Sequence, residues 1–309
     1  MPGEGPVREE RPVLTVYGAR GSHPVCGAEY LEFGGHTTCY AVRARGQVVI
    51  FDAGTGIIGL GDALAREHTD TGAPVVSTLL ISHTHHDHTQ GFPFFKPLHL
   101  PGSRLHLFGP RTEYVEVEDA LAQGMTAPFF PVSLGETKSV KTIRSVRDGA
   151  TICFFDQPQT PRVCSPEECA AARPRMLVRV RQGDRHPKAG VLYFRLECDG
   201  ASVVYATDTE GMDGGDPNLV AFARGASLLI HDAQYLPEEY TRSGGAKRGF
   251  GHSTYQMACE VARAAGVGRL LLHHHDPDRS DAQVCRIEAA ARELFAPTDA
   301  AREGATYRL

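Results

Sequence analysis

Short apolar runs recur along the chain between turn-forming residues, a pattern that predicts β-strands. The predicted strands are Val13–Tyr17, Cys39–Arg43, Val48–Phe51, Val75–Ser82, Arg104–Phe108, Met176–Val180, Val191–Glu197, Ser202–Ala206, Ser227–His231 and Leu270–His273. The second and third of these are expected to pair as a hairpin across Ala44–Gln47. Val75–Ser82 has the continuous apolar character of a buried strand, and it delivers the sequence HTHHDH (83–88) at its carboxyl end.

Helical composition marks four further segments. Ile57–Glu67 and Thr112–Gln123 are predicted to be helical. Ser253 followed by Gln256 forms a capping-box pattern for a helix that ends at Gly266. Ser280 followed by Gln283 repeats the pattern for a final helix that runs to about Phe295. Strands and helices thus alternate in both halves of the chain.

The segment 126–175 is poorly patterned and rich in proline, and we expect loops and short strands there. No repeat and no low-complexity linker divides the chain. Residues 1–12 are charged and rich in proline and glycine, so we expect a disordered N-terminal lead followed by one α/β domain over 13–309 with two layers of sheet.

Composition narrows the functional classes. The chain has 309 residues, of which 41% are hydrophobic, enough for a substantial core. It contains neither an apolar run of about 20 residues that could cross a membrane nor a signal-type apolar segment, so a cytoplasmic protein is expected. The net charge is -5 and no basic stripe is present, which argues against binding of long nucleic acid. A small anion remains compatible, because bound divalent cations reverse the local potential.

The eight cysteines are scattered, and none forms a CxxC pair. A cysteine-type zinc site is therefore not expected. We interpret the cysteines as reduced thiols that are mostly buried as small apolar residues. A redox role for Cys164 and Cys169, which share one loop, is the less favoured alternative.

The segment HTHHDH concentrates four histidines and one aspartate in six residues. His83 and His85 are two positions apart and can face one point, while Asp87 and His88 can turn toward a second point nearby. Imidazole and carboxylate groups are the ligands expected for zinc, manganese or iron. A solvated loop that is merely rich in histidine is the alternative, and the position directly after a buried strand disfavours it.

One loop cannot complete a site for two ions, so further ligands must come from distant segments. His186, Asp208 and the run His273–His275 are the candidates. For each, a role as a turn, cap or surface residue remains an equal alternative. Asp52 in DAGTG (52–56) is interpreted as a residue that fixes the turn, with support of the metal ligands as a further role.

His252 directly precedes a predicted helix, a position suited to proton donation, although it can also be a mere flanking residue. His231 and Asp232 belong to the same set of candidates.

These motifs resemble the metallo-β-lactamase-fold hydrolases, and among them the phosphodiesterase branch that includes ribonuclease Z and the cyclic-phosphate and cyclic-nucleotide phosphodiesterases. HTHHDH fits the superfamily pattern HxHxDH, and DAGTG fits the turn motif that precedes it. The resemblance extends from GARGS (18–22) to HHHDP (273–277). It implies an αββα four-layer sandwich in which helices flank two mixed β-sheets.

The resemblance also implies a ligand set for two divalent cations, most simply zinc, with manganese or iron as alternatives. His83, His85 and His186 would bind one ion, and Asp87, His88 and His274 the other, with Asp208 bridging them. His274 is chosen because HHDP (274–277) aligns with the corresponding stretch of ribonuclease Z.

The phosphodiesterase assignment rests on GHST (251–254), which resembles the ribonuclease Z element whose histidine is the proton donor. HDAQ (231–234) stands where that family has a glutamate, so Asp232 would orient His252. The implied catalytic residues are His252, Asp232 and Asp87. His36, where relatives usually have asparagine, either adjusts substrate preference or caps a turn.

The expected function is hydrolysis of a small anionic phosphodiester, such as a cyclic nucleotide, a sugar cyclic phosphate or a short oligonucleotide. Hydroxide formed between the two cations would attack phosphorus in line. No glycine- and lysine-rich arm like that of ribonuclease Z is found, which argues against tRNA. A thioester, lactone or lactam hydrolase is the alternative, and a catalytically idle metal-binding regulator is less favoured.

Three further expectations concern the surroundings of the site. Arg20 either holds the phosphate or braces its loop with a salt bridge. The segments 156–175 and Phe92–Pro97 are expected to shape the pocket. Relatives suggest a homodimer.

Overall fold

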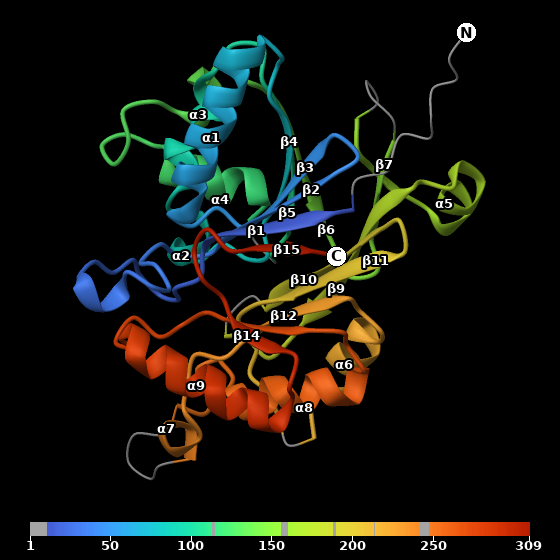
Figure 1. The fold of residues 1–309 in the computed structure, drawn as a ribbon. Helices are drawn as coiled ribbons and strands as arrows, with labels where there is room; N and C mark the ends of the chain where they lie inside the picture. The colour runs from blue at the N-terminus through green and yellow to red at the C-terminus, as the bar shows by residue number, and fades with distance from the viewer. Residues whose placement is uncertain (1–10, 113–114, 156–159, 188–189, 213, 242–246) are drawn as a thin grey trace, which may run out of the picture.

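Two β-sheets face each other in the computed structural model of this chain (Figure 1), which describes residues 11–112, 115–155, 160–187, 190–212, 214–241 and 247–309. The first sheet has the order β15-β1-β2-β3-β4-β5-β6. Its strands are β1 (Val13–Gly18), β2 (Cys39–Ala44), β3 (Gln47–Phe51), β4 (Val76–Leu80), β5 (Arg104–Pro110), β6 (Val140–Val146) and β15 (Thr306–Arg308). β3 to β6 run parallel, whereas β15, β1, β2 and β3 pair antiparallel.

The second sheet has the order β14-β13-β12-β11-β10-β9-β7-β8. Its strands are β7 (Thr151–Phe154), β8 (Arg162–Cys164), β9 (Met176–Gly183), β10 (Val191–Cys198), β11 (Ala201–Ala206), β12 (Leu228–Asp232), β13 (Leu270–His273) and β14 (Thr298–Ala300). β11 to β14 run parallel and the other strands pair antiparallel, so this sheet is mixed as well.

Helices cover the outer face of each sheet. The helices are α1 (Gly56–Thr71), α2 (His86–Thr89), α3 (Lys96–His99), α4 (Val117–Gly124), α5 (Pro166–Ala172), α6 (Pro217–Ala223), α7 (Pro237–Thr241), α8 (Tyr255–Ala265) and α9 (Asp281–Leu294), with 3-10 turns at Ala28–Tyr30, Phe92–Phe94 and Leu134–Glu136. α1, α3 and α4 lie over the first sheet, and α6, α8 and α9 over the second (Figure 1). Three hydrophobic clusters fill the space between the sheets and beneath each helical layer, which gives the expected αββα sandwich.

Most predicted strands are confirmed to within one to three residues at each end, because buried apolar runs are the strongest local signal for sheet. The C-terminal helix is confirmed together with its Ser280–Gln283 capping box. The lead predicted for 1–12 lies almost wholly outside the described residues. Among the described helices, none is both long and apolar enough to span a membrane.

Two helix starts were predicted wrongly. The helix predicted from Thr112 begins at Val117, and the Thr112 hydroxyl accepts a hydrogen bond from the Val115 amide (3.0 Å), a local side-chain contact that competes with helix formation. The N-cap of α8 is Thr254 rather than Ser253: Thr254 accepts the Met257 amide, while Ser253 donates to the carbonyl of Thr209 (2.5 Å).

The segment 126–175 contains more regular structure than expected. It includes the seven-residue strand β6 and the helix α5, whose N-cap Ser165 forms a capping box with Glu168. Ser165 stands directly before Pro166 and three positions before Glu168, so the local signal for this helix was present in the sequence.

The two sheets are joined directly beside HTHHDH. The amide of Leu192 in β10 donates to the carbonyl of Ser82 (2.9 Å), just beyond the end of β4. This contact places the segment 83–88 of the first sheet next to the carboxyl ends of β11 and β13 in the second. The functional candidates from both halves of the sequence therefore meet at one seam.

Candidate metal centre

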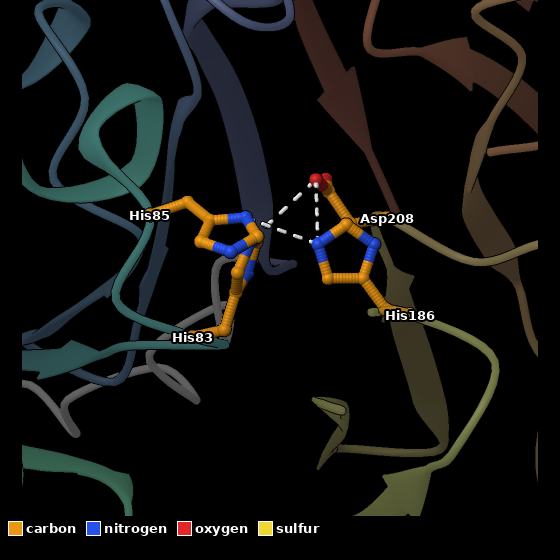
Figure 2. A group of neighbouring side chains, drawn as sticks. All are labelled: His83, His85, His186 and Asp208. Carbon is orange, nitrogen blue, oxygen red and sulfur yellow. Dashed lines mark hydrogen bonds and ion pairs between the residues drawn. The ribbon is translucent and has the colours of Figure 1, made fainter. Parts of the chain in front are cut away.

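The first cluster consists of His83, His85, His186 and Asp208, whose ligand atoms lie within 4.8 Å of one another. Figure 2 shows His83 and His85 facing His186 and Asp208 from the second sheet. Nε2 of His83 lies 3.5 Å from Asp208 Oδ2, and Nε2 of His186 lies 3.1 Å from Nδ1 of His85. Three imidazoles and one carboxylate oxygen thus surround a single point.

The second cluster consists of Asp87, His88, His274 and again Asp208, also within 4.8 Å. Nε2 of His88 lies 3.2 Å from Asp208 Oδ1, and Nε2 of His274 lies 3.3 Å from the same oxygen. Asp208 therefore turns Oδ2 toward the first cluster and Oδ1 toward the second. A carboxylate in this position can bridge two cations.

Asp52 fixes the second cluster from behind. Its Oδ2 accepts hydrogen bonds from His88 Nδ1 (2.7 Å), from the hydroxyl of Ser82 (2.7 Å) and from the hydroxyl of Tyr205 (2.6 Å). The side chain is fully buried. Because Asp52 holds Nδ1 of His88, the ring presents Nε2 to the cluster, the arrangement by which proteins orient metal-binding imidazoles.

Other rings are held in the same way. The carbonyl of Gly251 accepts from His186 Nδ1 (3.2 Å), and the amide oxygen of Gln234 lies 3.0 Å from His274 Nδ1. Gln234 was not among the sequence candidates, although it belongs to the HDAQ motif. Its role could not be read from the sequence, because the contact joins residues 40 positions apart.

The charge distribution suits a cationic occupant. Burial lowers the pKa values of His83, His85 and His186 and keeps these imidazoles neutral, as metal ligation requires. Burial raises the pKa of Asp208, but the histidines around it outweigh this effect and hold its pKa well below the usual value.

The two histidines of the second cluster behave differently. Burial lowers the pKa of His88, yet Asp208, Asp87 and Asp52 together raise it well above its usual value. The pKa of His274 is raised to about 9, since the carboxylates of Asp208, Asp87 and Asp232 outweigh burial. Without metal, both imidazoles are therefore protonated on both nitrogens, and positively charged, at neutral pH.

The residues present fit two divalent metal ions. Nε2 of His83 and Nε2 of His88 are buried and make no hydrogen bond of good geometry, although Asp208 oxygens lie 3.5 and 3.2 Å away, so both atoms face the space between the rings and the carboxylate. The donor set of five imidazoles and two carboxylates matches zinc and is also compatible with manganese or iron.

Metal uptake at the second cluster should release protons. A cation there displaces the protons of His88 and His274, so its apparent affinity should rise with pH until the pKa of His274, about 9, is passed. Below that pH, the apparent metal affinity should fall about tenfold for each proton displaced when the pH is lowered by one unit. Zinc titration calorimetry at pH 7 in two buffers of different ionisation enthalpy measures the released protons. Identical enthalpies in both buffers would contradict the assignment.

Backbone strain is concentrated at the centre. Asp52, Asp208 and His274 adopt left-handed conformations, with φ of 58°, 45° and 62°. Non-glycine residues rarely adopt this conformation, and it persists where surrounding contacts enforce it, often at functional sites.

Gly21 makes room for His274, since a Cβ at position 21 would lie 2.3 Å from the ring atoms Nδ1 and Cε1 of His274. Gly21→Ala should displace this imidazole and lower the metal content of the second cluster and the turnover by about 10- to 100-fold. Gly59→Ala is the matched control, because a Cβ there meets nothing within 4 Å on helix α1. Elemental analysis and turnover of both variants test this, and equal losses in the two variants would argue against it.

His252 and Asp232 lie together at the edge of the clusters. Nδ1 of His252 lies 2.6 Å from Asp232 Oδ2, and Asp232 Oδ1 accepts the amides of Gln234 and Ser253. The His252 ring stacks on His274 with 4.7 Å between centroids. The shorter aspartate side chain therefore reaches the imidazole directly.

An open cleft of about 440 Å³ gives access to this group. Its lining residues are Ser22, Thr84, His85, His86, Asp87, Asp208, His252 and His274. Of the segments that we expected to shape the pocket, Phe92–Pro97 and the described residues 160–175 contribute none of these lining residues, and residues 156–159 lie outside the described part of the chain. α5 lies at the far edge of the second sheet instead (Figure 1).

The expectation that Arg20 holds a substrate phosphate is not supported. Arg20 is 1% exposed, and its guanidinium donates to the carbonyls of Gly34 (2.8 Å) and Arg279 (2.8 Å) and lies 3.6 Å from Asp281. Arg20 therefore stabilises the loops that contain these residues, which was the alternative interpretation. His36 likewise contacts Thr55 (3.2 Å) and does not line the cleft.

Of the three consecutive histidines, only His274 joins a cluster. His273 contacts the hydroxyls of Tyr40 (2.8 Å) and Thr207 (3.0 Å), and His275 contacts the carbonyl of Ala301 (3.0 Å). Successive side chains along β13 point to opposite faces of the sheet, and the chain turns sharply after the strand. The three imidazoles therefore point in different directions.

Comparison with known proteins agrees with this geometry. Residues 47–275 match the family described as beta-lactamase superfamily domain. Ribonuclease Z of Thermococcus gammatolerans is 30% identical over 76% of this chain and 76% of its own length, and that of Mycolicibacterium gilvum is 30% identical over 82% and 83%.

The metallo-β-lactamase fold protein YhfI of Bacillus subtilis has the same fold, with a TM-score of 0.65, 18% identity, and coverage of 96% of this chain and 99% of YhfI. The matched segment 47–275 contains all seven residues of the two clusters, together with His252 and Asp232. The chain therefore belongs to the metallo-β-lactamase superfamily, as a ribonuclease Z-like member.

Proposed function

We propose that this metal-dependent hydrolase cleaves small phosphodiesters at a centre that holds two divalent cations. The observation that most supports this proposal is the position of the His252–Asp232 pair, which lies against the two clusters that share Asp208. Hydrolysis of a phosphodiester with a poor leaving group needs both charge stabilisation and a proton donor. A site with both features in one cleft suits this reaction.

The proposed ligands are the residues of the two clusters, with Asp208 between the ions. His83, His85 and His186 would hold one ion, and Asp87, His88 and His274 the other. When bound, the cations would supply Lewis-acid stabilisation of the phosphoryl oxygens and activate the attacking water. The fixed rings support this assignment, as do the buried Nε2 atoms of His83 and His88, which make no hydrogen bond and face the shared carboxylate of Asp208.

The protein's own residues would position the substrate and move the proton. Asp232 accepts from Nδ1 of His252 and so leaves Nε2 as the atom that protonates the departing oxygen. Asp87 Oδ2 accepts the amide of Ser22 (2.7 Å), which fixes this carboxylate at the cleft wall. Burial of Asp232 keeps water from competing for its carboxylate.

A small substrate is favoured over a long nucleic acid. Relatives of this chain are named ribonuclease Z, which supports phosphodiester chemistry. The net charge of -5 disfavours a long polyanion. The cleft of about 440 Å³ is within the range for small-molecule sites.

A substrate panel tests the proposal. Zinc-loaded protein should hydrolyse bis(p-nitrophenyl) phosphate faster than a thioester or nitrocefin, and a chelator should abolish the activity. Among natural phosphodiesters, cyclic nucleotides and cyclic phosphates should be cleaved faster than a tRNA precursor. Preference for the thioester, a lactone or nitrocefin would favour carbonyl hydrolysis, and preference for the tRNA precursor would overturn the proposed substrate size.

A further inference from the structure

Three cysteines meet at the edge of the second sheet. Cys153 lies in β7, Cys164 ends β8, and Cys169 lies in α5; their sulfur atoms are all within 4.8 Å of one another. Pairing of Cys153 with Arg162 and of Thr151 with Cys164 places both strand cysteines on one face of the sheet. Figure 1 shows α5 against these strands, at the opposite side of the molecule from α2.

From the sequence, a redox role for Cys164 and Cys169 was the less favoured alternative, and nothing indicated that Cys153 joins them, because it lies 11 and 16 positions away and no two of the three form a CxxC motif. Ile152 and Phe154 point into the core between the sheets, so Cys153 must point to the opposite face. The capping box at Ser165 then starts α5 at the position that brings Cys169 over Cys153. The fold thus gathers the three thiols.

The distances favour direct sulfur chemistry over a metal. Sγ of Cys153 lies 2.9 Å from Sγ of Cys169. Two thiolates on one tetrahedral zinc, with Zn–S about 2.3 Å, would be about 3.8 Å apart. A disulfide bond measures about 2.05 Å. The two sulfurs are therefore closer together than two thiolates on one zinc ion, and their separation lies between that value and the length of a disulfide bond.

We propose that Cys153 and Cys169 form a reversible disulfide by exchange with a low-molecular-weight disulfide such as oxidised glutathione. This site is independent of the proposed hydrolase activity and of the metal centre. Cys164 remains a thiol in the oxidised form. The reaction converts two protein thiols into one disulfide and reduces one external disulfide to two thiols.

Accessibility sets the order of the two steps. Cys169 is partly exposed, so its thiolate attacks the external disulfide first, forming a mixed disulfide and releasing one thiolate. Cys153 is buried and then attacks Sγ of Cys169, which releases the second thiolate. Burial and the neighbouring thiols raise the pKa of Cys153 above its usual value. The second step is therefore slow, because Cys153 must lose its proton before its sulfur can attack.

The bond would fasten α5 to β7. Cys153 and Cys169 are 16 positions apart, and the closed loop contains the whole edge strand β8. A covalent link across this edge restricts the unfolded chain and protects the strand edge. Oxidation should therefore raise the melting temperature without changing turnover at the distant cleft.

The experiment treats the full-length, metal-loaded protein with oxidised glutathione and follows its intact mass and its peptide map. Loss of two hydrogens and a Cys153–Cys169 cross-linked peptide, both reversed by dithiothreitol, are expected. Cys164→Ser should still form the link, whereas Cys169→Ser should stop at unlinked species. Cys26→Ser, at an exposed cysteine outside the cluster, is the control and should behave as the parent protein.

Two outcomes would overturn the proposal. One is a glutathione adduct that persists on Cys169 without a cross-link, although circular dichroism shows a folded protein. The other is cadmium binding with thiolate charge-transfer absorption that disappears in Cys164→Ser, because a metal site needs all three sulfurs and the disulfide needs only two.

Discussion

Asp208→Asn should remove metal from both positions of the centre and lower turnover by about 1,000-fold or more. Asp208 places one oxygen beside each cluster, so loss of its charge weakens both sites at once. Lewis-acid stabilisation is worth several kcal/mol, and about 1.4 kcal/mol corresponds to a factor of ten in rate. Elemental analysis should find close to two ions per chain in the parent protein and far fewer in the variant.

Asp216→Asn is the matched control for Asp208→Asn. Asp216 is also buried and caps α6, where asparagine can serve the same cap, and the variant loses only the ion pair with the exposed Arg185 (3.5 Å). This variant should keep its metal and its activity. Two retained ions and full activity in Asp208→Asn would refute the bridging role.

His252→Ala should lower turnover about 100- to 10,000-fold on substrates with poor, alkoxide-type leaving groups. The effect on a p-nitrophenyl leaving group should be much smaller, because that group departs without a proton. Metal content should remain unchanged, since His252 lies outside the two proposed ligand sets, although one of its ring nitrogens lies within 4.8 Å of ligand atoms of Asp208, Asp232 and His274 in a third group that could hold an ion. Asp232→Asn should show the same dependence on the leaving group, in weaker form.

His68→Ala, at a partly exposed histidine on α1, controls for loss of an imidazole elsewhere. Equal losses on good and poor leaving groups, or loss of metal in His252→Ala, would assign His252 a structural or ligating role. These outcomes separate proton donation from support of His274, on which the His252 ring stacks.

The parts of the site that sequence could predict were those with a local signal. HTHHDH follows a buried strand, and both features lie in one continuous segment. Asp208 and His274 follow strands in the same way, so the carboxyl edge of the sheet was a reasonable place to expect them. Local pattern was sufficient for these residues.

The remaining features depend on contacts between distant segments. Nothing near Asp52 indicates that Tyr205 and His88 will share its carboxylate, and nothing near Arg20 shows that Arg279 will bury its guanidinium. The separation of His274 from its two histidine neighbours depends on a left-handed residue in the turn after β13. Such features follow from tertiary packing, which short-range periodicity does not describe.

The division of the centre between the two halves of the chain has a consequence during synthesis on the ribosome. Asp87 and His274 are 187 positions apart, so at 5 to 20 residues per second the second ligand follows the first by roughly 10 to 40 s. During that interval the nascent chain exposes HTHHDH without His274, and until residue 208 has been added it also lacks Asp208. The proposed centre can therefore load completely only after His274 has been synthesised, and correct metal insertion would wait until β13 has joined its sheet.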